Sequence, residues 1–316
     1  MRIQLVTPAP LRINNGNKIT ALRWAGMLKK LGHRVRITQS YDDRACDALV
    51  ALHARRSYDA IERFHERHPG RPLVVVLTGT DVYRDIHIDS KAKRSLELAT
   101  RLVALQKMAL LELPKRLRHK TTVIYQSAEP IRSARRHRNR RFNVCVVGHL
   151  RAEKDPLRAA LAVRHLPPNS RILVTHIGQA LDETLGEKVQ REGARNARYR
   201  WIGRLSHDRT RKFLARSDLV CITSKMEGSS NVLSEALAAG VPVTASRISG
   251  LLGTLGKKFP GFYPAGNTTK LRTLLLKAES DRPFYDSLQR YCRNLAYLVN
   301  PKRELEAWRR LLRDLD

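Results

Sequence analysis

The sequence has no long apolar run, few cysteines and few acidic residues for its length. Because no stretch of about 18 apolar residues occurs, we expect no transmembrane helix. The four cysteines lie far apart without a C-x-x-C pair, which argues against zinc and favours buried, reduced thiols in a cytoplasmic protein. The short apolar stretch at the N-terminus predicts a first β-strand rather than a signal peptide.

Basic residues dominate the charge. Sixty Lys and Arg stand against 29 Asp and Glu, giving a formal net charge of +31 and a pI of about 10.9. Such a charge suits a nucleic acid, an anionic membrane or small anionic substrates, and equally an arginine-rich solvated surface. The densest stretches are Ile131–Arg141 and Arg191–Arg216. Aromatic residues make up only 6% of the chain, which argues against a stacking platform for single-stranded nucleic acid.

Short Val/Ile/Leu runs alternate with helical patterns in two series. This alternation predicts two doubly wound α/β domains in tandem, each with a parallel sheet covered on both faces. The polar, arginine-rich segment Glu129–Arg141 interrupts the rhythm and predicts a linker. We therefore expect an N-terminal domain at residues 1–135, a second domain at 136–285 and C-terminal helices at 286–316. Ligands of such sheets bind beyond the carboxyl ends of the strands.

One strand-to-helix segment combines an anion site with two carboxylates. Lys225–Gly240 has the sequence KMEGSSNVLSEALAAG, in which seven residues separate Glu227 from Glu235. Its small residues and backbone N–H groups predict an anion site at a helix N-terminus. Carboxylates beside such a site suit the hydroxyls of a sugar. A capping Glu and a surface Glu are the alternative.

A second strand end carries two cations. Val144–Asp155 has the sequence VCVVGHLRAEKD, so Arg151 and Lys154 follow a strand and Gly148. Two cations three residues apart can neutralise the charge that develops on a departing phosphate. In a chain this basic, two solvated cations are the alternative. Gly203–Leu205 also follows a predicted strand and gives a weaker signal.

Polar groups also end the strands of the first half. His53 ends an apolar strand and is followed by Arg55 and Arg56, and the flexible loop Asn14–Asn17 follows the first strand. A structural histidine and solvated arginines are the alternatives. The remaining candidates at strand ends are Thr78, Gly79, Thr80, Asp81, Gln126 and Ser127. All these groups are predicted to ring one cleft.

The Glu227–Glu235 spacing resembles the E-x7-E signature of GT-B glycosyltransferases of the family-4 group. The resemblance implies two Rossmann-like domains facing across a cleft, with a C-terminal helix that crosses back to the first domain. It implies that Glu227 contacts the donor sugar, Glu235 the ribose and the IGRL loop at Leu205 the base. Arg151 and Lys154 would grip the diphosphate, as in the family's G-x-L-x-x-x-K segment. Further donor-binding positions implied are Gly16, Gly148, Gly228, Ser229, Ser230, Asn231, Val232 and Leu233.

The chain as a whole resembles a narrower group, the selenosugar synthases of selenoneine biosynthesis. The segments that carry this resemblance are TALRWA, VALHARRS, LTGTDVYRDI, VIYQSAEP and EGSSNVLSEALAAGVPV. The resemblance implies transfer of a hexose from UDP-GlcNAc or UDP-glucose to selenophosphate, and a functional link to a selenophosphate synthetase. For such an acceptor we expect binding by the polar and cationic groups near the predicted strand ends of the first half, which are Asn15, Asn17, Lys18, His53, Arg55, Arg56, Thr78, Gly79, Thr80, Asp81, Gln126 and Ser127. The implied catalytic residues are His53, Arg151, Lys154 and Glu227.

This chemistry fits the composition of the chain. Selenium in selenophosphate is already a nucleophile, so no general base is required, and His53 and Asp81 are the base candidates that the sequence offers. No convincing D-x-D element is found, so we expect no metal and no cofactor. A GT-B enzyme with a hydroxyl acceptor is one alternative, and a polyanion-binding or nucleic-acid-binding protein is an alternative of another class. The amphipathic WRRLLRDL end has acidic neighbours, and we expect neither stable membrane association nor a nucleic-acid partner.

Overall fold

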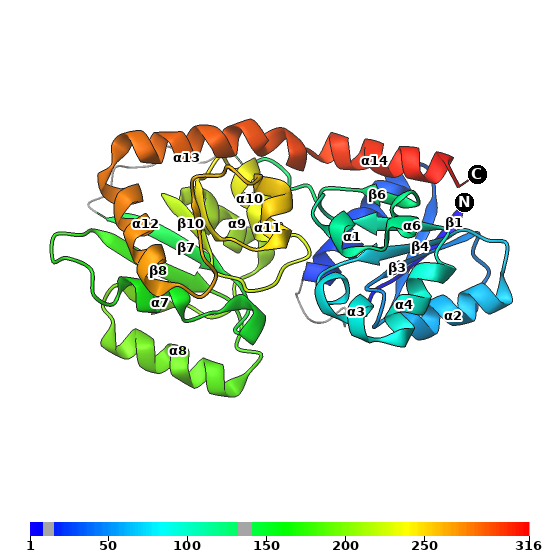
Figure 1. The fold of residues 1–316 in the computed structure, drawn as a ribbon, viewed down its shortest axis with the longest axis horizontal. Helices are drawn as coiled ribbons and strands as arrows, with labels where there is room; N and C mark the ends of the chain where they lie inside the picture. Colours follow the sequence, from blue (N-terminus) through cyan, green and yellow to red (C-terminus); the bar gives the residue numbers. More distant parts are fainter. Residues whose placement is uncertain (9–15, 132–140, 316) are drawn as a thin grey trace. The chain divides into compact units, whose positions relative to one another are not determined.

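The computed structural model describes residues 1–8, 16–131 and 141–315. Contacts divide the chain into two compact units. Unit 1 comprises residues 1–126, 227–230 and 301–316, and unit 2 comprises residues 127–226 and 231–300. Figure 1 shows the helices and strands of each unit.

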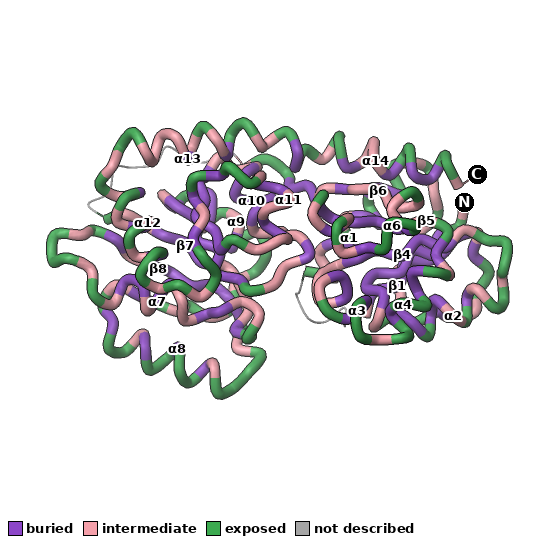
Figure 2. Tube along the Cα trace, viewed as in Figure 1, coloured by how far each residue is buried: buried purple, intermediate pink, exposed green. Residues whose placement is uncertain are grey.

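Unit 1 is built on a parallel sheet of six strands in the order β2-β1-β3-β4-β5-β6. Strands β3 and β4 are buried along their whole length because helices cover both faces of the sheet. Figure 2 shows these strands as buried segments. The strands are β1 (Arg2–Val6), β2 (Arg34–Thr38), β3 (Ala48–Leu52), β4 (Leu73–Leu77), β5 (Arg101–Ala104) and β6 (Thr121–Val123).

Alternate side chains of this sheet enter two hydrophobic cores. Leu49 and Ala51 face one core with Phe64 of α2, whereas Val50 and Leu52 face the other core. The helices of unit 1 are α1 (Gly16–Lys30), α2 (Tyr58–Arg67), the π-helix η1 (Asp81–Asp85), α3 (Ile86–Ile88), α4 (Ser90–Leu98), α5 (Ala109–Glu112), α6 (Lys115–Arg118) and α14 (Pro301–Arg313).

The C-terminal helix α14 packs into the second of these cores. Trp308 lies edge-on to Trp24 of α1, with ring centroids 4.8 Å apart. The Trp24 indole donates a hydrogen bond of 2.6 Å to the buried carboxylate of Glu304, which also pairs with Arg23. This packing confirms the expected return of the C-terminal helix to the first domain.

Unit 2 repeats the parallel arrangement, in the order β12-β11-β10-β7-β8-β9. Its strands are β7 (Phe142–Val147), β8 (Ile172–Ile177), β9 (Tyr199–Trp201), β10 (Leu219–Ile222), β11 (Val243–Ser246) and β12 (Phe262–Tyr263). Its helices are η2 (Ala152–Lys154), α7 (Arg158–Val163), α8 (Glu183–Arg195), α9 (His207–Arg216), α10 (Asn231–Ala238), α11 (Ser249–Leu255), α12 (Thr268–Ser280), α13 (Arg282–Leu295) and η3 (Ala296–Val299). Two parallel-sheet α/β units confirm the predicted fold class.

The units divide the chain at different places from the expected 135/136 and 285/286 boundaries. Unit 2 begins at residue 127, and the Ala128 N–H donates to the Val299 carbonyl of the same unit at 3.1 Å. The C-terminal helices are shared, because α13 belongs to unit 2 and α14 to unit 1. Most of the predicted linker lies outside the described residues.

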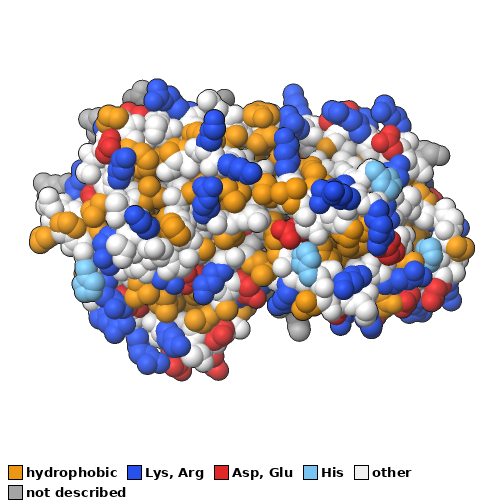
Figure 3. Space-filling view, viewed as in Figure 1, with side chains coloured by type: hydrophobic (Ala, Val, Ile, Leu, Met, Phe, Trp, Pro, Cys, Tyr) orange, Lys and Arg blue, Asp and Glu red, His pale blue; other side chains and the backbone are white. Residues whose placement is uncertain are grey.

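The four cysteines are buried and unpaired, as expected. Burial raises the pKa of the Cys145, Cys221 and Cys292 thiols to about 12, so they stay protonated at neutral pH. Within the described ranges, no helix is both long and apolar enough to cross a bilayer, and no cluster of three or more His, Cys, Asp and Glu could hold a metal ion. Lys and Arg are scattered over the face in Figure 3, among apolar and neutral groups.

Candidate functional site

Three glycines meet at the carboxyl ends of β7, β8 and β9 in unit 2. A Cβ on Gly178 would lie 1.8 Å from the carbonyl oxygen of Gly148, so only glycine fits there. The Gly178 N–H donates to the Gly203 carbonyl at 2.8 Å. Gly148 and Gly203 were predicted from their strand ends, and Gly178 was missed although it too directly follows a strand. Together these contacts fix the backbone of the predicted diphosphate loop.

The buried ring of His176 supports the same loop. Its Nε2 lies 3.0 Å from the Gly148 carbonyl oxygen, and its Nδ1 lies 2.9 Å from the Tyr199 hydroxyl. Burial lowers the pKa of His176 to about 4, so the ring is neutral. Since a carbonyl only accepts, Nε2 carries the proton and Nδ1 accepts from Tyr199. Sequence reasoning missed this residue because a histidine within a strand carries no distinctive signal.

The two predicted phosphate-binding cations, Arg151 and Lys154, lie in the turn that follows Gly148. The aliphatic stem of Lys154 lies over Gly148, with Cδ 3.6 Å from the position a Cβ would take there. The carbonyl of Lys154 accepts a hydrogen bond from the Thr223 hydroxyl at 2.8 Å, which ties the turn to the end of β10. Arg151 is exposed at the start of the turn. The turn therefore holds a cation beside the half-buried end of β7, an arrangement that suits a phosphate.

Glu235 lies on α10 and is 8% exposed. Its Oε1 accepts a hydrogen bond of 2.7 Å from Nε2 of His207, the first residue of α9. The loop that contains Gly203 and Leu205 leads directly to His207, which lies two residues after Leu205. Sequence reasoning missed His207, because it lies 28 residues from its partner.

The predicted sugar-binding segment Glu227–Ser230 belongs to unit 1. A Cβ on Gly228 would lie 2.1 Å from the Thr78 carbonyl oxygen and 2.7 Å from the Gly79 nitrogen. Glycine is therefore required for this close approach, which brings together a predicted donor residue and two predicted acceptor residues. Of the other predicted donor positions, Ser230 and Leu233 are buried, whereas Ser229, Asn231 and Val232 are half-buried.

Asp81 holds the turn that follows β4. Its carboxylate is fully buried and accepts hydrogen bonds from the backbone N–H groups of Ala54, Thr78 and Gly79, at 2.7–3.1 Å. These bonds join the ends of β3 and β4. The observed role of Asp81 is thus to shape the strand ends, while its predicted contact with an acceptor stays a prediction.

His53 ends β3 with a positive φ of 76°, a conformation that L-residues rarely adopt. Its Nδ1 accepts a hydrogen bond of 3.2 Å from the Arg56 backbone N–H. Because Nδ1 accepts, Nε2 is the ring nitrogen that donates, and it lies 2.9 Å from the Thr80 hydroxyl oxygen. Thr80 then directs its own hydroxyl proton elsewhere, and its half-buried side chain can offer that proton to a ligand.

The remaining predicted residues of the first half of the chain differ in burial and in pairing. Arg55 pairs with Asp89 at 2.5 Å, and the Arg56 side chain is exposed. Gln126 is buried and donates to the Thr20 hydroxyl of α1, 2.5 Å away. Ser127 is buried in unit 2, Asn17 and Lys18 are half-buried on α1, and Gly16 is exposed at its start. Asn15 lies outside the described residues.

Residues 127–295, more than half of the chain, match the family "Glycosyl transferases group 1". The chain belongs to the group 1 glycosyl transferases. Anabaena Alr3699/HepE in complex with UDP matches it with a TM-score of 0.75 over 100% of both chains, at 16% identity. Sucrose-phosphate synthase from Thermosynechococcus elongatus matches with a TM-score of 0.80, covering 99% of this chain and 98% of that chain, at 14% identity. These likenesses confirm the GT-B fold.

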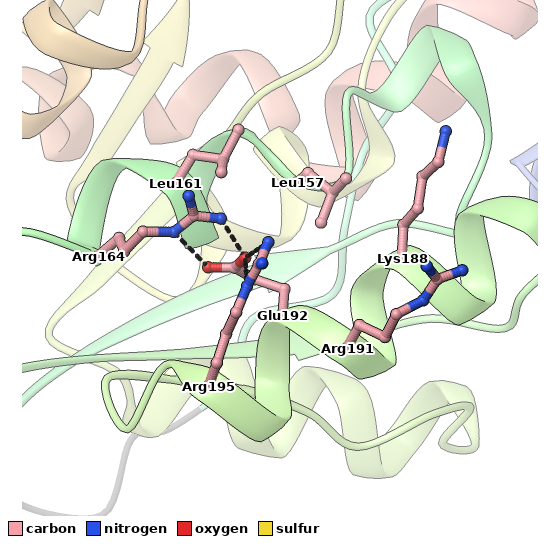
Figure 4. Close-up of a pocket in the computed structure, with 7 residues that line it drawn as sticks. All are labelled: Leu157, Leu161, Arg164, Lys188, Arg191, Glu192 and Arg195. Carbon is pink, nitrogen blue, oxygen red and sulfur yellow. Dashed lines mark hydrogen bonds and ion pairs between the residues drawn. The ribbon is translucent and has the colours of Figure 1, made fainter.

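A cavity of about 250 Å³ lies between α7 and α8 of this glycosyl transferase. Figure 4 shows Glu192 held between the guanidinium groups of Arg164 and Arg195, with Lys188 and Arg191 on the same helix as Glu192. Asn196 adds a fifth N–H donor to the carboxylate of Glu192, which is 1% exposed. Glu192 pairs with Arg164 and Arg195, and Arg191 pairs with Glu187, so three of the four cations already have a carboxylate partner. The cavity therefore gives little support to a polyanion-binding function.

Because the carboxylate of Glu192 is buried and hydrogen-bonded, we expect the folded protein to lose stability in acid. Hydrogen bonds from Arg164 lower its pKa to about 2. The stabilisation is therefore complete above the ordinary glutamate pKa of about 4.5 and is lost as the pH falls toward 2. Glu192→Gln should flatten the decline in the free energy of unfolding between pH 5 and pH 3, measured by urea denaturation. Glu187→Gln, which removes an exposed ion pair with Arg191, is the control and should leave the decline unchanged. Equal slopes for wild type and Glu192→Gln would contradict the assignment.

Proposed function

We propose that this glycosyl transferase acts in the cytoplasm and transfers a hexose from UDP-GlcNAc or UDP-glucose to selenophosphate. The donor half of this proposal rests on unit 2. Lys154 and Arg151 follow Gly148, and the buried carboxylate of Glu235 lies on the helix after the GSSN segment. Structures of HepE in complex with UDP and with UDP-glucose have the same fold. A uridine diphosphate moiety suits these groups because it carries both phosphates and ribose hydroxyls.

The hydrogen bonds of the His53 ring support the second half of the proposal, which concerns the acceptor. Its Nδ1 accepts from a backbone N–H, and its Nε2 donates to Thr80, so neither ring nitrogen offers a free lone pair. The Asp81 carboxylate is occupied by three backbone N–H groups. Neither base candidate from the sequence is thus placed to deprotonate a hydroxyl acceptor. An acceptor that is already an anionic nucleophile, such as selenophosphate, needs no such base.

The proposed reaction proceeds by displacement at the anomeric carbon. A bond forms between selenium and C1 while the bond between C1 and the diphosphate oxygen breaks, and UDP leaves with the electron pair. Arg151, Lys154 and the backbone N–H groups near Ser229–Asn231 stabilise the charge on the departing diphosphate. Water then cleaves the Se–P bond, giving a 1-seleno-sugar and phosphate. A selenophosphate synthetase would supply the acceptor.

A hydroxyl acceptor is the alternative, because a departing diphosphate oxygen can itself take the acceptor proton. Steady-state release of UDP separates the two functions. With either UDP-sugar and the purified enzyme, UDP release should require selenophosphate and should not respond to free hexoses or hexose phosphates at the same concentration. Release that depends on a sugar hydroxyl and is unaffected by selenophosphate would favour the alternative and overturn the proposal.

We also propose that no divalent metal takes part, because Lys154 and Arg151 supply the positive charge at the diphosphate. The rate of UDP release should then change less than about twofold when 5 mM EDTA replaces 5 mM Mg²⁺ at constant ionic strength, since the cations are part of the chain. Re-addition of Mg²⁺ or Mn²⁺ after EDTA is the control. A tenfold or greater loss in EDTA that the metal restores would contradict this part of the proposal.

The hydrogen bond from His53 to Thr80 predicts that Thr80 binds the acceptor through its hydroxyl proton. Thr80→Val keeps the shape of the side chain but removes the donor, and kcat/KM for selenophosphate should fall about tenfold. Thr80→Ser keeps the hydroxyl and should retain most of the activity. The KM for the UDP-sugar should be unchanged in both variants. If Thr80→Val matched the wild type, Thr80 would have no contact with the acceptor.

A further inference from the structure

The Glu235–His207 pair lies in unit 2, between α10 and α9. The two helices are in contact, and the ring Nε2 lies 2.7 Å from Oε1 of a carboxylate that is almost completely buried. The His207 side chain is 47% exposed, whereas that of Glu235 is 9% exposed. The buried carboxylate of Glu235 is thus hydrogen-bonded to a histidine that is partly exposed to solvent. The hydrogen bond from His207 sets the direction in which the Glu235 carboxylate points.

The hydrogen-bonding capacity of Glu235 is only partly used. An ionised carboxylate has about four acceptor positions on its two oxygens. His207 donates to Oε1, and the described residues place no hydrogen-bond donor on Oε2. One oxygen is therefore fixed in direction while the other keeps its acceptor positions. Two neighbouring hydroxyls of a ribose are the kind of group that could use them, because each hydroxyl can donate one hydrogen bond.

His207 is fixed in turn by the loop before it. Ser206 caps α9, with its hydroxyl accepting from the Arg209 N–H at 3.3 Å. At the other end of the loop, Gly203 adopts a φ of 68°, and its carbonyl accepts from the Gly178 N–H at 2.8 Å. The loop with Leu205, which was predicted to contact the base, is therefore continuous with the residue that holds the predicted ribose ligand. One anchored segment therefore carries the predicted base contact and the residue that is hydrogen-bonded to the predicted ribose ligand.

We propose that His207 is a positioning residue for the nucleoside, which directs the free acceptor positions of Glu235 to the two ribose hydroxyls. This inference rests on the proposed use of a UDP-sugar. It assigns to His207 a contribution to the selection of ribonucleotides over deoxyribonucleotides. A site that is built to accept a hydroxyl proton discriminates strongly against a ligand that lacks the hydroxyl, because its polar groups are then left unpaired.

Binding of UDP and of 2′-deoxy-UDP to the full chain, measured by titration calorimetry, tests the proposal. The wild type should prefer UDP by at least about tenfold. His207→Ala should weaken UDP binding about tenfold and should reduce the preference to about twofold, because Glu235 is no longer oriented. His207→Gln keeps a donor at this position and should recover part of the preference. In turnover, His207→Ala should raise the KM for the UDP-sugar with little change in kcat.

His165→Ala is the matched control, since His165 is an exposed histidine of the same unit, and it should leave both affinities unchanged. Thermal unfolding of each variant checks that α9 is intact. If the wild type binds UDP and His207→Ala keeps both the affinity and the preference, the inference on His207 is overturned and the proposed donor stands. If the wild type does not bind UDP at all, the proposed function fails together with the inference.

Discussion

Replacing Lys154 with alanine should lower kcat for UDP release by about 10²–10³-fold, which is typical of removing a group that stabilises charge in a transition state. The reason lies in the geometry of the turn. The stem of Lys154 lies over Gly148, and its backbone carbonyl is tied to Thr223, so the ammonium group is carried by a fixed turn at the end of β7. Negative charge grows on the diphosphate as it departs, and the interaction with Lys154 strengthens at that moment.

Steady-state kinetics of UDP release measure this effect. The KM for the UDP-sugar should rise less than kcat falls, because the cation acts mainly on the transition state. Lys154→Arg keeps the charge and should recover part of the rate. Lys188→Ala on α8 removes an equal charge away from this turn and is the matched control. A Lys154→Ala enzyme with wild-type kcat would remove Lys154 from the catalytic groups.

Asp81→Ala should lower the free energy of unfolding by about 3 kcal/mol or more. The substitution leaves the backbone N–H groups of Ala54, Thr78 and Gly79 without their acceptor in a buried place, and each unsatisfied buried donor costs about 1–3 kcal/mol. Asp81→Asn keeps one carbonyl oxygen and should lose less. Because the three bonds join the ends of β3 and β4, activity should be lost even where the variant stays folded.

Urea unfolding followed by circular dichroism measures this loss of stability. Asp59→Ala is the control, because the Asp59 side chain is 89% exposed and its ion pair with Lys91 is at the surface. Its effect should be below about 0.5 kcal/mol. If Asp81→Ala were as stable as Asp59→Ala, the carboxylate would not be the group that holds this turn, and its predicted role as a direct acceptor ligand would gain support.

Much of the fold could be predicted from the sequence, because buried parallel strands have a distinctive composition. The continuous apolar runs at Ala48–Leu52 and Leu73–Leu77 predicted strands that the structure confirms. Strand ends also predicted the positions of Gly148 and Gly203. The contacts of α14 could not be derived from local patterns. Trp24 and Glu304 are 280 residues apart, and nothing in their local sequence indicates that they meet.

The sequence could predict which kinds of residue form the site and that they follow strands. It could not predict which atoms these residues contact. The carboxylates and cations were selected because they follow strands, and this criterion also applies to Asp81, whose carboxylate serves the backbone instead. Hydrogen bonds decide such roles, and they depend on distances that a sequence does not contain. For the same reason His176 and His207 were missed, although each lies within 3.0 Å of a predicted site residue.

Mass spectrometry of the reaction product tests the central claim most directly. The enzyme is incubated with selenophosphate and either UDP-GlcNAc or UDP-glucose, and the small-molecule fraction is searched for the isotope pattern of selenium. We predict a hexose that carries one selenium atom, formed together with an equal amount of UDP and absent when the enzyme or selenophosphate is omitted. UDP-sugar consumption without any selenium-containing sugar, or no reaction with either donor, would contradict the proposed function.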